Sequence, residues 1–238
     1  MSAIGHDGVG RGGFQPPRLT LCLGVVMAAA YLLLGPAPAG LMLERQAVAD
    51  GEIWRLFTAH LVHADTAHLS WNLGAFLVLS GLYELQERPG PGRYFGLLAA
   101  SALAVDAWFW WLQPGLPVYC GLSGVLNGFF AILAVFLWRR TRHPAIALAG
   151  LAAIAKIAVE AGLGAPLLPT TTWTAVPGAH GAGFAAGLLL GLARFLARER
   201  PRACLGADRE SRYYPRVSCI PQALGHRQGR WRGVMLRR

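Results

Sequence analysis

The sequence has little charge and a single lysine, Lys156. Asp, Glu, Lys and Arg make up 14% of the 238 residues, against 54% hydrophobic residues, and this ratio excludes an ordinary soluble fold. The four cysteines show no CxxC pair and no metal-ligand spacing, which indicates neither a disulfide scaffold nor a zinc site. The chain is therefore predicted to be a membrane protein.

Positive charge is concentrated at the C-terminal end. Residues 198–238 hold eleven arginines against three acidic residues, which gives +8 of the net charge of +10. Because the rest of the chain is close to neutral, we interpret the basicity as membrane topology and a tail, and we expect no nucleic-acid partner. The tail lacks apolar periodicity and is predicted to be disordered cytoplasmic chain. Binding of the tail to anionic lipid is an alternative role.

Six apolar stretches predict an all-α bundle of six transmembrane helices. Arginines follow the fourth and sixth stretches, whereas residues 113–117 and 164–176 carry no charge, so the positive-inside rule places both termini in the cytoplasm. We therefore expect a leader over 1–18, a six-span core over 19–197 and the tail over 198–238. The six stretches are 19–34, 66–83, 94–112, 118–138, 144–163 and 177–196.

The first stretch has a second interpretation. Arg11 and Arg18 precede it, and Ala37-Pro38-Ala39 after it is similar to a signal-peptide cleavage site. The prolines and the 18-residue leader favour a retained helix. Cleavage would leave five spans in the same orientation.

Polar side chains from three predicted spans fall at one depth near the outer surface. Ser123, in the sequence GLSG, lies about one turn inside the fourth span, and His180 lies about one turn inside the sixth. His68 and Asn72 lie at the outer start of the second span, four residues apart, and so share one face of a helix. Polar groups in a membrane are costly, which makes this layer a candidate functional site.

Helix caps and the spacing of glycines add detail to this candidate site. Asp65 or Thr66 can cap the second span and leave His63 in the loop ahead of it. His180 begins a stripe with glycines at i+3, i+7 and i+11, and glycines let two helix backbones approach closely. If the sixth span packs on the fourth, the imidazole comes within reach of the Ser123 hydroxyl, as a general base must. The glycines concerned are Gly183, Gly187 and Gly191 on the sixth span and Gly124 and Gly128 on the fourth.

At these motifs the chain resembles the rhomboid intramembrane serine proteases. The resemblance covers residues 51 to 196 and rests on WR at 54–55, the spacing of His63, His68 and Asn72, GLSG at 121–124 and AHGAGFAAG at 179–187. It implies a Ser123/His180 dyad without a cofactor, and an oxyanion hole made by the Ser123 N–H, His68 and Asn72. Asn127 departs from the family pattern, in which an aromatic residue or a histidine is frequent. Supporting residues by the same resemblance are Gly121, Gly124, His63, Trp54, Arg55, Gly183 and Gly187.

Within the family, the run GEIWRLFTAHLVHADTAHLSWNLGAF looks most like the rhombosortase subgroup of bacteria. This resemblance implies that the chain sits in the bacterial inner membrane with its active site open to the periplasm. It also implies that the partners are lipid and membrane proteins with a C-terminal anchor helix, cut near a Gly-Gly motif ahead of that helix. A wet outer rim is expected from Glu52, Arg55 and the loop around His63, because hydrolysis needs water at the bond.

Three further charges fall in predicted spans: Asp106, Lys156 and Glu160. Lys156 and Glu160 are four residues apart, which predicts an ion pair within one helix. The alternative makes Lys156 the base for Ser123. Two other functions are compatible with these residues: an ion- or proton-coupled transporter, for which no internal repeat is visible, and a rhomboid-like protein that binds membrane clients without cutting them.

Overall fold

The computed structural model describes residues 15–165, 167 and 176–199. Most of the predicted leader and all but the first two residues of the predicted tail, with Cys204 and Cys219, lie outside the described residues.

Six long helices coincide with the six apolar stretches to within five residues at either end, and the fourth stretch becomes helical only at Ser123, because β2 and a turn occupy residues 118–122. They are α1 (Arg18–Leu34), α4 (Thr66–Glu87), α5 (Pro91–Ala107), α6 (Ser123–Thr141), α7 (Pro144–Leu163) and α8 (Pro177–Glu199). The loops between them hold η1 (Ala39–Leu41), α2 (Arg45–Ala49), α3 (Arg55–Thr58) and the π-helical η2 (Trp108–Leu112). Two short strands, β1 (Leu43–Glu44) and β2 (Val118–Tyr119), pair antiparallel and are the only β-structure in the part of the chain described.

Three of these helical segments are long and apolar enough to cross a bilayer. They are Pro91–Leu112, Pro144–Leu163 and Pro177–Ala197, while Arg18–Leu34 is apolar but shorter. The chain is thus a mostly helical membrane protein, and the number six for its spans remains a prediction.

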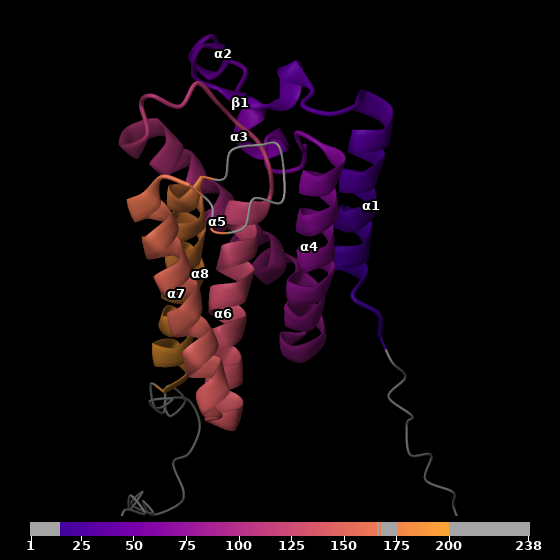
Figure 1. The fold of residues 1–238 in the computed structure, drawn as a ribbon. Coiled ribbons are helices and arrows are strands. Elements are labelled where there is room, and N and C mark those ends of the chain that lie inside the picture. Colours follow the sequence, from indigo (N-terminus) through magenta and orange to yellow (C-terminus); the bar gives the residue numbers. More distant parts are fainter. Residues whose placement is uncertain (1–14, 166, 168–175, 200–238) are drawn as a thin grey trace, which may run out of the picture. The chain divides into compact units, whose positions relative to one another are not determined.

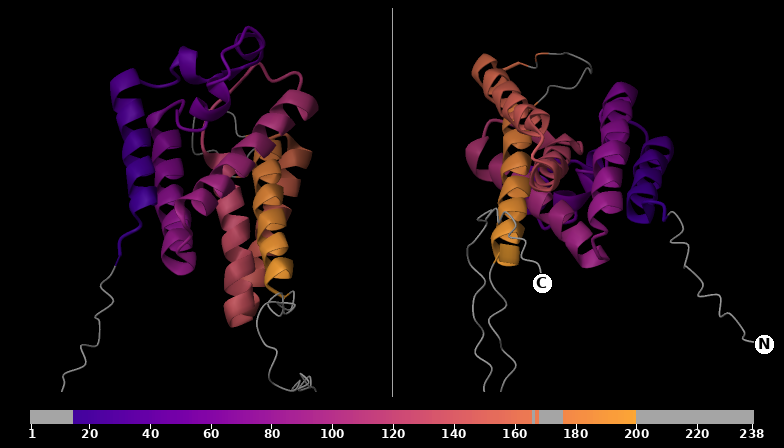
Figure 2. Two further views of the ribbon diagram at one scale, coloured as in Figure 1. Left: turned by 180° about the vertical axis from the view of Figure 1, so that it is seen from behind. Right: turned by 90° about the horizontal axis from the view of Figure 1, so that it is seen from below.

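The described chain starts and finishes at one end of the helices. The start of α1 and the end of α8 both point toward the lower end in Figure 1, on opposite sides of the bundle, and α2, α3 and β1 lie at the upper end. The view from behind in Figure 2 shows the same arrangement. Both ends of the described chain therefore point to the same side of the helices.

Glycines join α6 and α8 backbone to backbone. A β-carbon at Gly183 would clash with the carbonyl oxygen of Gly124, and one at Gly187 would clash with that of Gly128. In the other direction, a β-carbon at Gly128 would lie 3.0 Å from the Gly183 oxygen. The predicted glycine stripe therefore packs as expected, and only glycine fits these contacts.

A carboxylate of α4 satisfies the start of α1. Glu84 accepts hydrogen bonds from the backbone N–H groups of Leu19, at 3.0 Å, and Thr20, at 2.9 Å, and from the Thr20 hydroxyl. The first N–H groups of a helix have no partner within it and carry partial positive charge. Glu84 therefore fixes α1 to α4 at the end where the described chain begins.

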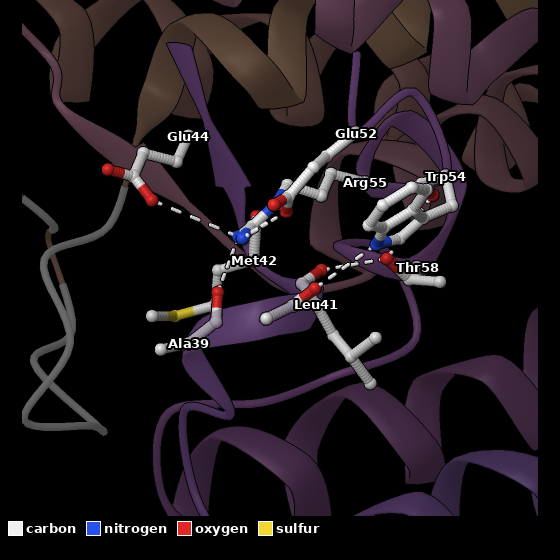
Figure 3. A network of polar contacts seen from close by, with 9 residues as sticks. Ala39, Leu41, Met42, Glu44, Glu52, Trp54, Arg55 and Thr58 are labelled. Atoms are coloured by element: carbon white, nitrogen blue, oxygen red, sulfur yellow. Dashed lines mark hydrogen bonds and ion pairs between the residues drawn. The ribbon is translucent and has the colours of Figure 1, made fainter. Parts of the chain in front are cut away.

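Arg55 organises the loop ahead of α4, as Figure 3 shows. Its guanidinium pairs with Glu52 and donates to the carbonyl oxygens of Ala39 and Met42, and its side chain is only 7% exposed. The expectation that Arg55 belongs to a wet rim is wrong, because these acceptors replace water around the charge. Trp54 donates to the Gly40 oxygen in the same loop.

Candidate active site

The hydroxyl of Ser123 and the imidazole of His180 are in hydrogen-bond contact. Ser123 Oγ lies 3.0 Å from His180 Nε2, although 57 residues separate them. Ser123 is the first residue of α6 and His180 lies in the first turn of α8. The Gly124–Gly183 contact lies beside this pair, so close helix packing brings the two side chains together.

The turn before Ser123 is built around Gly121. Its φ of +114° is a conformation that residues with a β-carbon rarely adopt. Its N–H donates to the Ala59 oxygen at 2.8 Å, and its carbonyl accepts from the Tyr119 hydroxyl at 3.2 Å. The turn is therefore fixed on two sides, which orients the start of α6.

His68 and Asn72 converge on that turn from α4. A β-carbon at Gly121 would lie 2.5 Å from His68 Nε2 and 3.8 Å from Asn72 Nδ2. Both side chains are buried and on one face, as predicted. Asp65 caps the helix by accepting from the His68 N–H at 2.7 Å, which decides between the two predicted caps.

The hydrogen bonds of His68 determine which ring nitrogen carries the proton. His68 Nδ1 accepts from the backbone N–H of Ala64 at 3.4 Å. A neutral imidazole has one acceptor and one donor nitrogen, so Nε2 is the donor and is directed at the Gly121 turn. Asn72 Nδ2 donates to the His68 oxygen at 3.0 Å and has a second N–H to offer. Ser123, as first residue of α6, has a backbone N–H that the helix does not use.

His63 lies in the loop ahead of α4, as predicted, but it is completely buried. Its ring packs edge-on against that of His68, with 5.0 Å between the ring centres. Burial, and to a smaller degree His68, lowers the pKa of His63 to about 3, so its ring is neutral near pH 7. His63 therefore supports the ring of His68 and does not act as a charge.

A second buried pair lies behind the turn and was not predicted. His60 Nε2 lies 3.1 Å from Asp106 Oδ1, and the His60 ring packs edge-on against Tyr119. The sequence marked Asp106 as a charge in a predicted span. Its partner His60 lies 46 residues earlier, just after the end of α3. Only the fold brings the two together.

The Ser123/His180 pair opens into a cavity of about 480 Å³. Side chains from α4, α6, α7 and α8 line it. Asn127 lies there and donates to the Ser123 carbonyl oxygen at 2.9 Å. The described contacts give Asn127 no bond to the His180 ring. The lining residues that matter below are Leu126, Phe130, Ala153, Lys156 and Ile157.

Lys156 and Glu160 form the ion pair predicted from their spacing. Lys156 Nζ lies 2.7 Å from both carboxylate oxygens of Glu160. His180, and not Lys156, is in hydrogen-bond contact with Ser123. Among the residues described, no three His, Cys, Asp or Glu side chains are grouped so that they could hold a metal ion.

This set of groups suits acyl transfer. A hydroxyl in contact with an imidazole can be activated for attack on a carbonyl carbon. The His68 Nε2–H, the Asn72 amide and the Ser123 N–H are donors of the kind that stabilise a tetrahedral oxyanion.

Comparison with known proteins agrees with this chemistry. Residues 50–197 match the Rhomboid domain. YdcA of Bacillus subtilis, a candidate rhomboid protease, is 33% identical over 86 residues, which are 36% of this chain and 42% of that protein. The rhomboid protease GlpG of Haemophilus influenzae is 29% identical over 149 residues, which are 60% of this chain and 70% of that protein.

Proposed function

The chain belongs to the rhomboid family of serine proteases, and from this we propose that it cleaves transmembrane segments of other membrane proteins, with Ser123 as nucleophile and His180 as base. The 3.0 Å contact between Ser123 Oγ and His180 Nε2, inside a cavity among the helices, is the observation that carries the proposal.

In the proposed reaction His180 Nε2 takes the proton of the Ser123 hydroxyl as its oxygen attacks the substrate carbonyl carbon. The tetrahedral intermediate collapses when the imidazolium gives that proton to the leaving amine, and an acyl-Ser123 ester remains. Water, deprotonated by His180, then attacks the ester, and the proton returns to Ser123. Each proton that His180 accepts is thus given up again within the cycle.

The oxyanion of that intermediate is assigned to three donors. His68 contributes Nε2–H, Asn72 its amide and Ser123 its backbone N–H. The Ala64 bond to His68 Nδ1 supports this assignment, because it leaves the donor nitrogen directed at the turn. The Gly121 turn would hold the nucleophile at the distance that these donors require.

Two pairs of charged residues take no part in the chemical steps of this proposal. Asp106 is paired with His60, and Glu160 with Lys156. A transporter would need such groups to exchange ions along a path. Their pairing favours the protease over that alternative.

The substrates are proposed to be of the rhombosortase type. A transmembrane helix buries its peptide bonds in its own hydrogen bonds and must unwind before attack, and glycine lowers the cost of unwinding. A Gly-Gly motif ahead of a C-terminal apolar helix is therefore a suitable cleavage point. The distribution of arginine supports cytoplasmic termini. The resemblance to rhombosortases supports a bacterial inner membrane with the active site open to the periplasm.

The test uses the purified full-length chain in liposomes with a reporter that contains Gly-Gly, an apolar helix and an arginine cluster. We expect cleavage at the Gly-Gly, mapped by mass spectrometry, and none with Ser123→Ala. A reporter with Leu-Leu in place of Gly-Gly should be cut more slowly. Cleavage by Ser123→Ala at the wild-type rate would refute the protease, and client binding without cleavage would favour the non-catalytic alternative. Equal cleavage of both reporters would refute only the proposal that the substrates are of the rhombosortase type.

A further inference from the structure

Among the described residues that line the cavity beside Ser123, Lys156 carries the positive charge. Lys156, the only lysine of the chain, lines it together with Ser123 and His180. The Lys156 side chain is 48% exposed, whereas the side chain of its partner Glu160 is 2% exposed. The pair therefore has a buried acidic end and an open ammonium end.

Glu160 holds the ammonium in place. Its two oxygens each lie 2.7 Å from Lys156 Nζ, and Oε1 also accepts from the backbone N–H of Leu167 at 3.0 Å. An ammonium has three N–H donors. Two are directed at Glu160, and the described contacts of Lys156 use no more than these, so a third donor is available on the cavity side.

Part of the cavity lining on α7 and α6 is apolar. Ala153 and Ile157 flank Lys156 on α7, and Leu126 and Phe130 lie on α6. A polar side chain brought into such surroundings loses its bonds to water and must find another partner. The other polar side chains of the lining are already engaged: Ser123 with His180, and the amides of Asn72 and Asn127 with backbone oxygens. Lys156 adds a charged donor that can serve as that partner.

We propose that Lys156 is a specificity-determining residue that binds an uncharged hydrogen-bond acceptor, such as a side-chain amide, in the substrate segment. The inference rests on the proposed protease function and names a substrate feature of the same site. The acceptor is uncharged because Glu160 already neutralises the ammonium. A second carboxylate would leave a net negative charge beside the buried Glu160 carboxylate, and the two like charges would repel each other.

A site built to satisfy a polar group discriminates strongly against an apolar analogue of the same shape. Asn and Leu are nearly equal in shape, which makes them the appropriate pair. The probe is a set of reporters for the liposome assay, each with one Leu→Asn change at successive positions on both sides of the cleaved bond. For wild type we expect Asn to raise kcat/KM about tenfold over Leu at one position or two adjacent ones. Asp at the same position should be cut more slowly than Asn.

The variant is Lys156→Met combined with Glu160→Gln, which removes both charges together and leaves no unpaired buried carboxylate. The Asn/Leu ratio should fall to about one, while Lys156→Arg, which keeps a donor, should preserve a preference. Leu151→Met, on the exposed side of α7, is the matched control and should keep the wild-type ratio. Thermal unfolding in detergent reports whether each variant is folded.

The outcomes separate this inference from the proposed function. If wild type cuts none of the reporters, the protease proposal fails. Three outcomes would refute the role of Lys156 and leave the protease proposal intact. Wild type could cut the reporters without preferring Asn at any position, or it could prefer Asp to Asn. The third is an Asn/Leu ratio that stays unchanged in the folded double variant.

Discussion

His60 and Asp106 form a buried pair directly behind the turn that presents Ser123, with 3.1 Å between His60 Nε2 and Asp106 Oδ1. The carbonyl oxygen of Ala59, the residue before His60, accepts the hydrogen bond from the Gly121 N–H. The His60 ring contacts Tyr119, whose hydroxyl donates to the Gly121 carbonyl oxygen. The pair thus acts on the nucleophile through the turn and touches neither Ser123 nor His180.

Removing one member of this pair should cost more than removing both. Asp106→Leu leaves His60 without its partner, and His60→Leu leaves a buried carboxylate, each at about 3–5 kcal/mol. The double variant His60→Leu/Asp106→Leu should recover part of that loss. Unfolding of all four proteins in detergent measures the coupling, and additive losses would show that the two side chains do not interact.

The choice between two bases can be tested with a serine-reactive probe. His180→Ala should abolish labelling of Ser123 as completely as loss of the serine, because groups that act as a unit are not additive. Lys156→Met combined with Glu160→Gln should still be labelled, because Lys156 is bound to Glu160 and not to Ser123. Labelling of His180→Ala together with loss of labelling in the folded Lys156→Met/Glu160→Gln variant would transfer the role of base to Lys156.

The proposed roles of His68, Asn72 and His63 predict a graded series of losses in kcat. His68→Ala and Asn72→Ala should each lower kcat roughly 10²- to 10³-fold with little change in KM, since the oxyanion exists only in the transition state. His63→Ala should cost less, because His63 acts by packing on the His68 ring. Turnover of the Gly-Gly reporter gives the three values. A silent Asn72→Ala beside an inactive His63→Ala would contradict the assignment of this face.

Gly183 and Gly181 of α8 allow a matched test of the close contact between α6 and α8. Gly183→Ala would place a methyl group against the Gly124 oxygen and force α6 and α8 apart, which should lower stability by about 1–3 kcal/mol or more and lower activity sharply. Gly181→Ala would lie 3.5 Å from Ile157 Cγ2, an ordinary contact, and should change neither. The midpoint of thermal unfolding and the reporter assay distinguish them. Equal behaviour of the two variants would show that this close contact is not needed.

Stability should fall in acid partly through His63. The folded pKa is about 3 and the unfolded value is near 6.5, so between these values the unfolded chain binds a proton that the folded chain does not. Stability is therefore lost as pH falls from 6.5 toward 3. His63→Asn should flatten this part of the curve of unfolding midpoint against pH. Parallel curves for the variant and wild type would contradict a buried, neutral His63.

The sequence predicts the helices well because each depends on a local apolar stretch. Ser123, His180, His68 and Asn72 were also accessible from it, because helical spacing and motifs put them at one depth. The His60–Asp106 pair was not, because it joins α5 to a segment that shows no periodicity. Arg55 was misjudged as a rim residue, because its acceptors are backbone carbonyls of a loop and no sequence pattern marks a carbonyl as a partner.

The contact of Gly183 and Gly187 with the carbonyl groups of Gly124 and Gly128 determines how accurately the reactive pair is aligned. Ser123 and His180 stand beside two main chains in direct contact, and a main chain has no rotamers to sample. Side-chain fluctuations elsewhere in the bundle therefore change the shape of the cavity without changing the separation of the helices that carry the two reacting atoms. Relatives could alter the cavity walls to accept other substrates while keeping the alignment of the dyad intact.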